Sequence, residues 1–312
     1  MKQYILACCL ICAGCETVVE VEVPQYDSKL VVTSHFSPDS IWSVSLHRSL
    51  TIGVRQNPSA LYVEGATVTI LNDDGIAESL VYQGSGLYGS VIGTQPIAGV
   101  RYRLHVESGD ELQLTAASTA PLPPLITYSS VETVAENVPS GLTPHNIYRL
   151  SITFTDVPTE ENYYRIGVYH FQRNHGFIES TPDSVYKLIH VYAPALGWYC
   201  GFSEAIGGPA GNLTAADICD SFVVTDRLFD GEEYHWGANV DLENYTDRPK
   251  KERLLIVLSS LSRDYFEYQR TLRDNIGTGV FGEPVPVYTN ISGGLGIFAG
   301  FANADIVFEI HK

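Results

Sequence analysis

Residues 65–75 read Gly65-Ala66-Thr67-Val68-Thr69-Ile70-Leu71-Asn72-Asp73-Asp74-Gly75. Apolar side chains alternate with threonines in the first part of this stretch, and a period of two predicts a strand with one buried face. Asp74-Gly75 is typical of the tight turn of a hairpin, and a second apolar run follows at residues 80–82. The stretch therefore predicts two antiparallel strands.

Similar short runs lie on both sides of this hairpin at roughly ten-residue spacing, which favours an antiparallel sandwich. They cover residues 19–23, 29–36, 42–46, 87–92, 101–106 and 112–116. Residues 99–106 also look like a late strand of immunoglobulin-like modules. We therefore predict a mainly β protein in which residues 15–120 form an immunoglobulin-like antiparallel sandwich.

Three prolines, Pro121, Pro123 and Pro124, then form a stiff and extended connector. We place the domain boundary there, and we predict that residues 121–312 form a second β-rich domain. Its expected strands cover residues 148–154, 163–171, 185–192, 222–224, 253–258 and 306–310.

One segment of the second domain has helical spacing instead. Apolar residues at positions 265, 268, 272 and 276 predict one amphipathic helix over residues 262–276, packed on a sheet. The first residue, Ser262, suits an N-cap, and Leu261 and Phe266 occupy the two positions of a hydrophobic staple. Arg270 and Asp274 lie one turn apart and can form an ion pair.

The composition bounds the class of protein. The chain has 312 residues, of which 45% are hydrophobic and 18% are charged, which is enough apolar material for real cores and excludes a disordered chain. The 19 Lys and Arg against 36 Asp and Glu give a net charge of −17 at pH 7. This is the wrong sign for binding a phosphate backbone, so we expect no nucleic-acid partner.

The N-terminus has the parts of a signal peptide, namely Lys2, an apolar run over residues 4–13 and small residues before a break. The run is too short for a transmembrane helix, which needs about 20 residues. Cys12-Ala13-Gly14-Cys15 resembles the bacterial lipoprotein box, in which the last cysteine is lipidated and becomes the mature N-terminus. We predict that residues 1–14 are removed and that Cys15 carries the lipid. The alternative is an ordinary secretory signal in which Cys15 is incidental.

The remaining cysteines predict a disulfide. Three of the six leave with the signal and Cys15 carries lipid, so that Cys200 and Cys219 are left. An even pair in an exported chain favours a disulfide, and two free buried thiols are the alternative. We predict no metal ion, because no third cysteine supports zinc and because His170 and His175 are poorly spaced as ligands.

Enzyme signatures are missing from the sequence, which has no G-x-S-x-G, H-E-x-x-H, G-x-x-x-x-G-K-[ST] or EF-hand motif. We predict no catalytic residue and no cofactor. Residues 232–236 gather two glutamates and a histidine, but Asp230-Gly231 before them predicts a solvated turn. Most aromatic residues between 163 and 199 are expected to fill a β core. Trp198 and Tyr199 are candidates for contact with a glycan or peptide ligand.

The C-terminal third contains a distinctive string. It reads Phe281-Gly282-Glu283-Pro284-Val285-Pro286-Val287-Tyr288-Thr289-Asn290-Ile291 and, after one residue, Gly293-Gly294-Leu295-Gly296-Ile297-Phe298-Ala299-Gly300. Together with residues 254–266, this string resembles the Bacteroidota outer-membrane lipoprotein family known as domain of unknown function 4249. From the residues themselves, Pro284 and Pro286 predict an edge strand, and the glycines predict a tight return before the last strand.

The resemblance implies a lipoprotein that accompanies a SusC-like TonB-dependent transporter. Glu16, with Glu20 and Glu22, resembles the acidic region that directs such lipoproteins to the cell exterior. We therefore expect a non-enzymatic accessory partner in nutrient capture or complex assembly, anchored in the outer membrane by its lipid and facing outward. The alternatives are a surface glycan or peptide hydrolase that uses Glu232 or Glu233, and an adhesive or scaffolding β-module.

Overall fold

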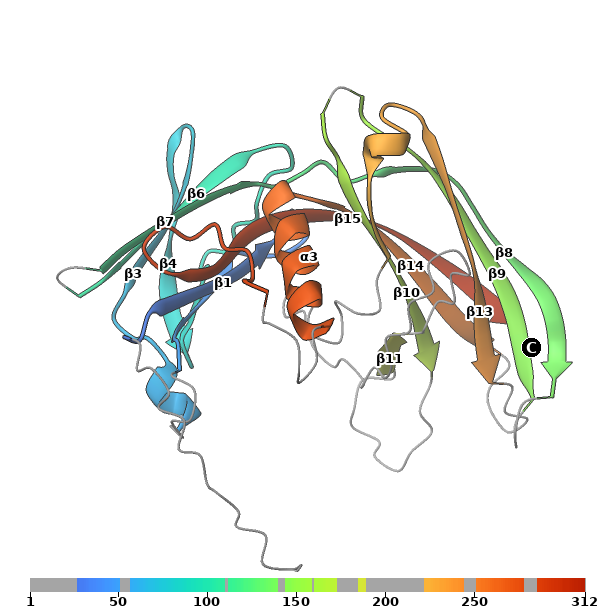
Figure 1. Ribbon diagram of the computed structural model, residues 1–312, viewed down its shortest axis with the longest axis horizontal. Coiled ribbons are helices and arrows are strands. Elements are labelled where there is room, and N and C mark those ends of the chain that lie inside the picture. The colour runs from blue at the N-terminus through green and yellow to red at the C-terminus, as the bar shows by residue number, and fades with distance from the viewer. Residues whose placement is uncertain are drawn as a thin grey trace, which may run out of the picture.

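The computed structural model describes residues 27–50, 57–109, 112–139, 144–158, 160–172, 185–188, 222–243, 251–277 and 285–311. These residues form a mainly β structure with one α-helix among them, which confirms the predicted class (Figure 1). They build one large mixed sheet and a separate three-stranded sheet. None of the described helices is long and apolar enough to span a membrane.

The large sheet follows the strand order β11-β10-β14-β15-β1-β2-β5-β4-β3-β6-β7, and β12 pairs with β10 beside this path. Its N-terminal strands are β1 (Leu30–Phe36), β2 (Ser43–Arg48), β3 (Thr67–Asn72), β4 (Gly75–Gly84), β5 (Leu87–Gly89), β6 (Arg101–Ser108) and β7 (Leu112–Thr119). Its C-terminal strands are β10 (Tyr163–Gln172), β11 (Val185–Leu188), β12 (Phe222–Thr225), β14 (Lys251–Leu261) and β15 (Leu295–His311). Short 3-10 helices cover Pro58–Leu61 and Asp226–Leu228.

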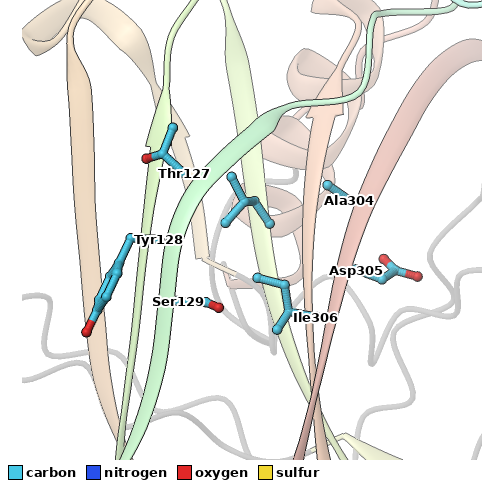
Figure 2. A pocket seen from close by; sticks show the side chains of 7 residues that line it. Thr127, Tyr128, Ser129, Ala304, Asp305 and Ile306 are labelled. Carbon is cyan, nitrogen blue, oxygen red and sulfur yellow. The ribbon is translucent and has the colours of Figure 1, made fainter.

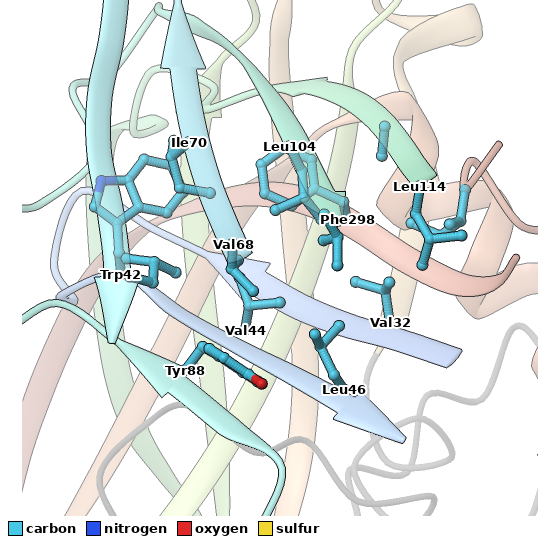
Figure 3. Packing of buried hydrophobic residues seen from close by; sticks show 14 of the residues in the cluster. Val32, Trp42, Val44, Leu46, Val68, Ile70, Tyr88, Leu104, Leu114 and Phe298 are labelled. Carbon is cyan, nitrogen blue, oxygen red and sulfur yellow. The ribbon is translucent and has the colours of Figure 1, made fainter. Parts of the chain in front are cut away.

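The predicted hairpin is confirmed as β3 and β4, with Asn72 opposite Gly75 across the turn. Around it, the N-terminal part of the large sheet curls so that β1, β2 and β15 face β3, β6 and β7. Figure 3 shows the core between these layers. It includes Val32, Trp42, Val44, Leu46, Val68, Ile70, Leu104, Leu114 and Phe298. The shared core shows this curled sheet, and an immunoglobulin-like sandwich is not shown.

The three-stranded sheet has the order β13-β9-β8 and consists of β8 (Leu125–Val138), β9 (His145–Thr155) and β13 (Glu233–Glu243). A second core packs this sheet against β10, β14 and β15, with Leu150, Phe154, Val240 and Ile256 fully buried. The turn predicted from Asp230-Gly231 is present, since the Glu232 N–H donates to the Phe229 carbonyl at 2.8 Å and Gly231 has a φ of +72°. It covers only the start of residues 232–236, because β13 begins at Glu233 and buries Trp236.

The predicted helix is confirmed as α3 (Arg263–Gly277), which lies on one face of the sheet (Figure 1). The Ser262 hydroxyl accepts a hydrogen bond from the Tyr265 N–H at 3.3 Å, as an N-cap does. Arg270 and Asp274 form the expected ion pair at 3.7 Å. The buried face of α3 carries Tyr265, which packs with Phe301 of β15.

β15 belongs to both halves of the chain. Over residues 295–300 it pairs in parallel with β1, and over residues 301–311 it pairs antiparallel with β14. The prolines at 121–124 fall between β7 and β8. The division into two domains at that point stays a prediction.

The segment before β15 differs from the sequence-based expectation. The edge strand expected at Pro284 and Pro286 is wrong over its described part, because residues 285–290 form no strand. Instead, the Asn290 side chain accepts from the Phe298 N–H at 3.0 Å and donates to the Phe298 carbonyl at 2.7 Å. The Asn290 side chain thus holds this segment against β15 through hydrogen bonds, in place of the backbone hydrogen bonds of an edge strand. The predicted glycine return is confirmed at Gly293, which has a φ of +84°.

We predict that Gly296→Ala lowers the free energy of unfolding by more than about 3 kcal/mol. Gly296 has a φ of +104°, and an added Cβ would overlap the carbonyl oxygen of Val32 on β1. Gly65→Ala is the matched control, since Gly65 has a φ of +73° with open space around it and should lose only about 1–2 kcal/mol. Urea unfolding measures both variants, and equal losses would contradict a role for the close approach to β1.

Candidate functional site

The residues predicted to carry lipid, a disulfide or a ligand all lie outside the described residues. They are Cys15, Trp198, Tyr199, Cys200 and Cys219. These assignments stay predictions. Of the aromatic residues that precede them, Tyr163 and Tyr164 are buried, as expected for strand residues that fill a core.

A groove lies between β8 and β15, as Figure 2 shows. It has a volume of about 380 Å³ and is lined by residues 126–129 and 304–306. Ser129 and Ile306 point into the space between the strands, whereas Tyr128 and Asp305 point away from it. The groove exists because, among the described residues, β8 pairs only with β9 and the second half of β15 pairs only with β14.

Exposed apolar side chains surround this groove. Leu125 and Tyr128 of β8 are 67% and 56% exposed, and Val307 of β15 is 53% exposed. The strands thus present backbone edges and apolar side chains together, as strands that bind extended peptides do. Sequence reasoning missed this site because it did not predict β8. The only signal was the run of β-branched and aromatic residues within positions 126–134.

Three carboxylates gather where β9 and β12 end and β13 begins. Oxygens of Asp156, Asp226 and Asp230 lie within 4.8 Å of one another, and the first two residues are buried. Carboxylate oxygens are the ligands of hard cations, so these residues could hold Ca²⁺. Hydrogen bonds already give two of them a structural role. Asp156 accepts from the Tyr164 hydroxyl at 2.6 Å and from the Gly231 N–H at 2.8 Å, and Asp226 accepts from a backbone N–H at 2.6 Å.

A buried polar cluster lies between α3 and the sheet. Arg165 of β10 is 7% exposed, and its guanidinium donates to the hydroxyls of Tyr265 and Ser259, both at 3.3 Å. His35 of β1 packs on the Tyr265 ring, with ring centroids 4.7 Å apart. Burial and, to a smaller degree, the Arg165 charge lower the pKa of His35 to about 4. The imidazole beneath α3 is therefore neutral at pH 7.

Comparison with known families gives one match over nearly the whole chain. A family model described as "Domain of unknown function (DUF4249)" matches residues 16–306. No curated protein matches the chain.

Comparison with solved structures gives only distant likenesses. A mutant of Salmonella alpha-2-macroglobulin is 10% identical with a TM-score of 0.24, over 95% of this chain and 16% of that one. Escherichia coli alpha-2-macroglobulin activated by porcine elastase is 10% identical with a TM-score of 0.21, over 91% and 20%. A putative membrane anchored protein from Corynebacterium diphtheriae is 11% identical with a TM-score of 0.20, over 77% and 56%. The chain thus spans at most 20% of the length of these two macroglobulins.

The carboxylate cluster yields a stability prediction. Asp156→Ala should lower the free energy of unfolding by about 2–4 kcal/mol, because it removes the acceptor of two hydrogen bonds at a buried position. Tyr164→Phe removes only one of them and should cost about 1–2 kcal/mol. Asp73→Ala in an exposed turn is the control and should change stability by less than about 0.5 kcal/mol. If Asp156→Ala unfolds in urea like this control, the structural role is contradicted.

His35 yields a prediction about pH. The unfolded chain binds a proton at this histidine near its ordinary pKa of about 6.5, whereas the folded chain does so only near 4. The free energy of unfolding should therefore fall as pH decreases from 6.5 to 4, by up to about 1.4 kcal/mol per pH unit from this residue. Urea unfolding of the wild type and of His35→Gln across that range isolates the effect. Parallel pH profiles for the two proteins would contradict it.

Proposed function

The chain belongs to the DUF4249 family, and from this premise we propose that it is a lipid-anchored outer-membrane lipoprotein of a Bacteroidota cell. It faces the cell exterior and acts as a non-enzymatic accessory partner of a SusC-like TonB-dependent transporter in nutrient capture or complex assembly. The observation that carries the proposal is Cys12-Ala13-Gly14-Cys15 directly after a short apolar run. Each buried methylene of an acyl chain contributes about 0.8 kcal/mol, so a triacylated Cys15 would stay in the membrane.

The acidic character of the chain supports exposure on the outer surface. Glu16, Glu20 and Glu22 follow the lipidation position, and the whole chain has a net charge of −17. Negative charge keeps an exported protein solvated and disfavours non-specific contact with an anionic membrane surface.

A binding role is favoured over hydrolysis by the placement of the carboxylates that a hydrolase would use. Glu232 and Glu233 are both exposed, and Glu233 accepts a hydrogen bond from Thr127 at 3.4 Å. Glycosidases need two carboxylates that flank a bound sugar at a set separation. Glu232 and Glu233 are neighbours in sequence at the exposed start of β13, whereas residues of two separate strands line the groove between β8 and β15, which suits a binding role.

The finer fold assignment belongs to the same proposal. Residues 15–120 form an immunoglobulin-like unit, and residues 121–312 form a β-rich unit that contains α3. The second core, around the three-stranded sheet, supports this division, because all of its residues follow position 121.

Lipidation can be tested in a Bacteroidota host. A clickable palmitate analogue should label the wild-type protein and the control Cys12→Leu, which keeps a small-residue pair before Cys15. Cys15→Ala should lose the label and leave the membrane fraction, because it has no thiol to acylate. Labelled wild-type protein should also be degraded when intact cells are treated with protease. Equal labelling of Cys15→Ala would contradict lipidation there, and full protease resistance would contradict outward exposure.

The partner is tested by purification from native membranes in mild detergent. Tagged wild-type protein should bring down a large barrel protein of the TonB-dependent class in a stoichiometric complex. Recovery of the protein alone would contradict the accessory role. Turnover of a glycan or peptide that Glu232→Gln or Glu233→Gln abolishes would favour the hydrolase instead.

A further inference from the structure

Among the described residues, the second half of β15 has one backbone edge without a strand partner. β1 pairs with β15 only as far as Gly300, and residues 301–311 have β14 as their single strand neighbour among the described residues. Every second residue of this half therefore directs an N–H and a C=O away from β14. An unpaired edge of this kind is a template for one more strand.

The edge of β8 faces β15 across the groove. Bulges interrupt the pairing of β8 with β9 near Thr127 and near Val134, but the register is regular over residues 128–133. Within this regular stretch, Ser129 points toward Ile306 of β15 (Figure 2). Both side chains leave room between the strands, and the space they line opens to solvent on the outer side.

The side chains of β15 define what would fit beside it. Its inward residues Ile306 and Phe308 pack on the second core, while its outward residues Asp305, Val307 and Glu309 are exposed. Directly opposed residues of neighbouring strands interact through their side chains, and opposite charges or paired apolar groups stabilise the pairing. A strand added beside β15 would therefore carry apolar residues on its inner face. On its outer face it would carry basic residues near Asp305 and Glu309 and an apolar residue near Val307.

Of the two outward carboxylates, Asp305 is the one that a basic residue on the added strand would stabilise more. On β14 it faces Val257, whereas Glu309 faces Arg253. Partial desolvation and, next, the Asp39 carboxylate raise the pKa of Asp305. A lysine or arginine placed on the free side would relieve this repulsion by Asp39, because an opposite charge within a few ångströms favours the ionised carboxylate.

We propose that the groove between β8 and β15 binds an extended segment of a partner protein, which adds to the free edge of β15 and places a lysine or arginine beside Asp305. The segment closes the open side of the packed sheets, with its inner side chains against Ile126 and Ser129. The inference deepens the proposed function by giving the partner a docking surface, and it rests on that function only for the identity of the partner.

Charge argues against the two other occupants. In a pair of identical chains joined antiparallel at Val307, Asp305 of one copy would face Glu309 of the other, and directly opposed like charges destabilise a strand pair. The chain's own N-terminal segment carries Glu20 and Glu22 on alternate positions, so it would bring negative charge to the same place. A basic strand from a different protein has neither conflict.

The experiment uses the full chain and a fluorescent peptide, acetyl-Lys-Val-Lys-Val-Lys-Val-Lys-amide, in fluorescence anisotropy at low salt. The wild-type protein should bind this peptide, and should bind its glutamate counterpart at least about tenfold more weakly. A version with alternate amides N-methylated on one edge should also lose about tenfold or more, because it cannot form the ladder with β15. Bound peptide should slow hydrogen exchange of the amides in residues 304–309.

Variants test the position of the segment. Asp305→Asn should weaken binding about three- to tenfold and reduce its dependence on salt, since it removes the charge but keeps the shape. Ser129→Trp fills the groove and should abolish binding. Glu160→Gln, an equal charge change at an exposed position outside the groove, should leave the affinity unchanged.

Several results would overturn the inference. They are equal affinity for the N-methylated peptide, unchanged binding in both Asp305→Asn and Ser129→Trp, and protection that appears at another sheet edge instead. A wild-type dimer in sedimentation that Ser129→Trp dissolves would assign the groove to a second copy and would also overturn it. Failure to purify with a barrel protein, with the peptide results intact, would contradict only the proposed function.

Discussion

β15 pairs in parallel with β1 over residues 295–300 and antiparallel with β14 over residues 301–311, so one strand joins the two packed cores. The pairing with β1 and the packing against β7 bring backbones together so closely that a side chain cannot fit at two positions of β15. A Cβ at Gly296 would overlap the carbonyl of Val32, and one at Gly300 would overlap the carbonyl of Thr119. The glycines in the C-terminal string are therefore a steric requirement of the fold.

The position of β15 also fixes the positions of α3, of the segment around Asn290 and of the groove. The Ser262 N–H donates to the Gly300 carbonyl at 2.9 Å, which fixes where α3 begins above β15. Asn290 holds the preceding segment on Phe298 and Ala117, between β15 and β7. Since β1 ends at Phe36, its pairing stops there, and among the described strands the rest of β15 pairs only with β14. The groove is thus a consequence of one strand being longer than its neighbour.

Local patterns predicted the elements that depend on local chemistry. The hairpin at Asp74-Gly75 and the helix with its cap at Ser262 follow from turn and capping preferences, and both are confirmed. β8 was not predicted because it lies at an edge, where its residues are exposed or half-buried on both faces and show no period of two. β13 was missed because Asp230-Gly231 indicates a turn, and the strand begins right after it.

Partner strands distant in sequence were beyond such reasoning, because no local pattern states which edges meet. The role of Asn290 and the cluster of Asp156 with Asp226 also depend on contacts between remote segments. The residues predicted to carry lipid, a disulfide or a ligand lie outside the described residues; they are Cys15, Trp198, Tyr199, Cys200 and Cys219. The candidate groove follows instead from which strands pair with each other.

The direction of β1 relates the groove to the proposed anchor. β1 starts at Leu30 and runs parallel to β15, so the free edge of β15 begins beyond the far end of β1. If the lipid on Cys15 tethers the chain through the residues before Leu30, the tether enters at one end of this strand pair and the groove lies past the other. A docked segment would then meet the protein away from its point of attachment. Bulges such as those of β8 and charges such as that of Asp305 disfavour the pairing of sheet edges with another copy.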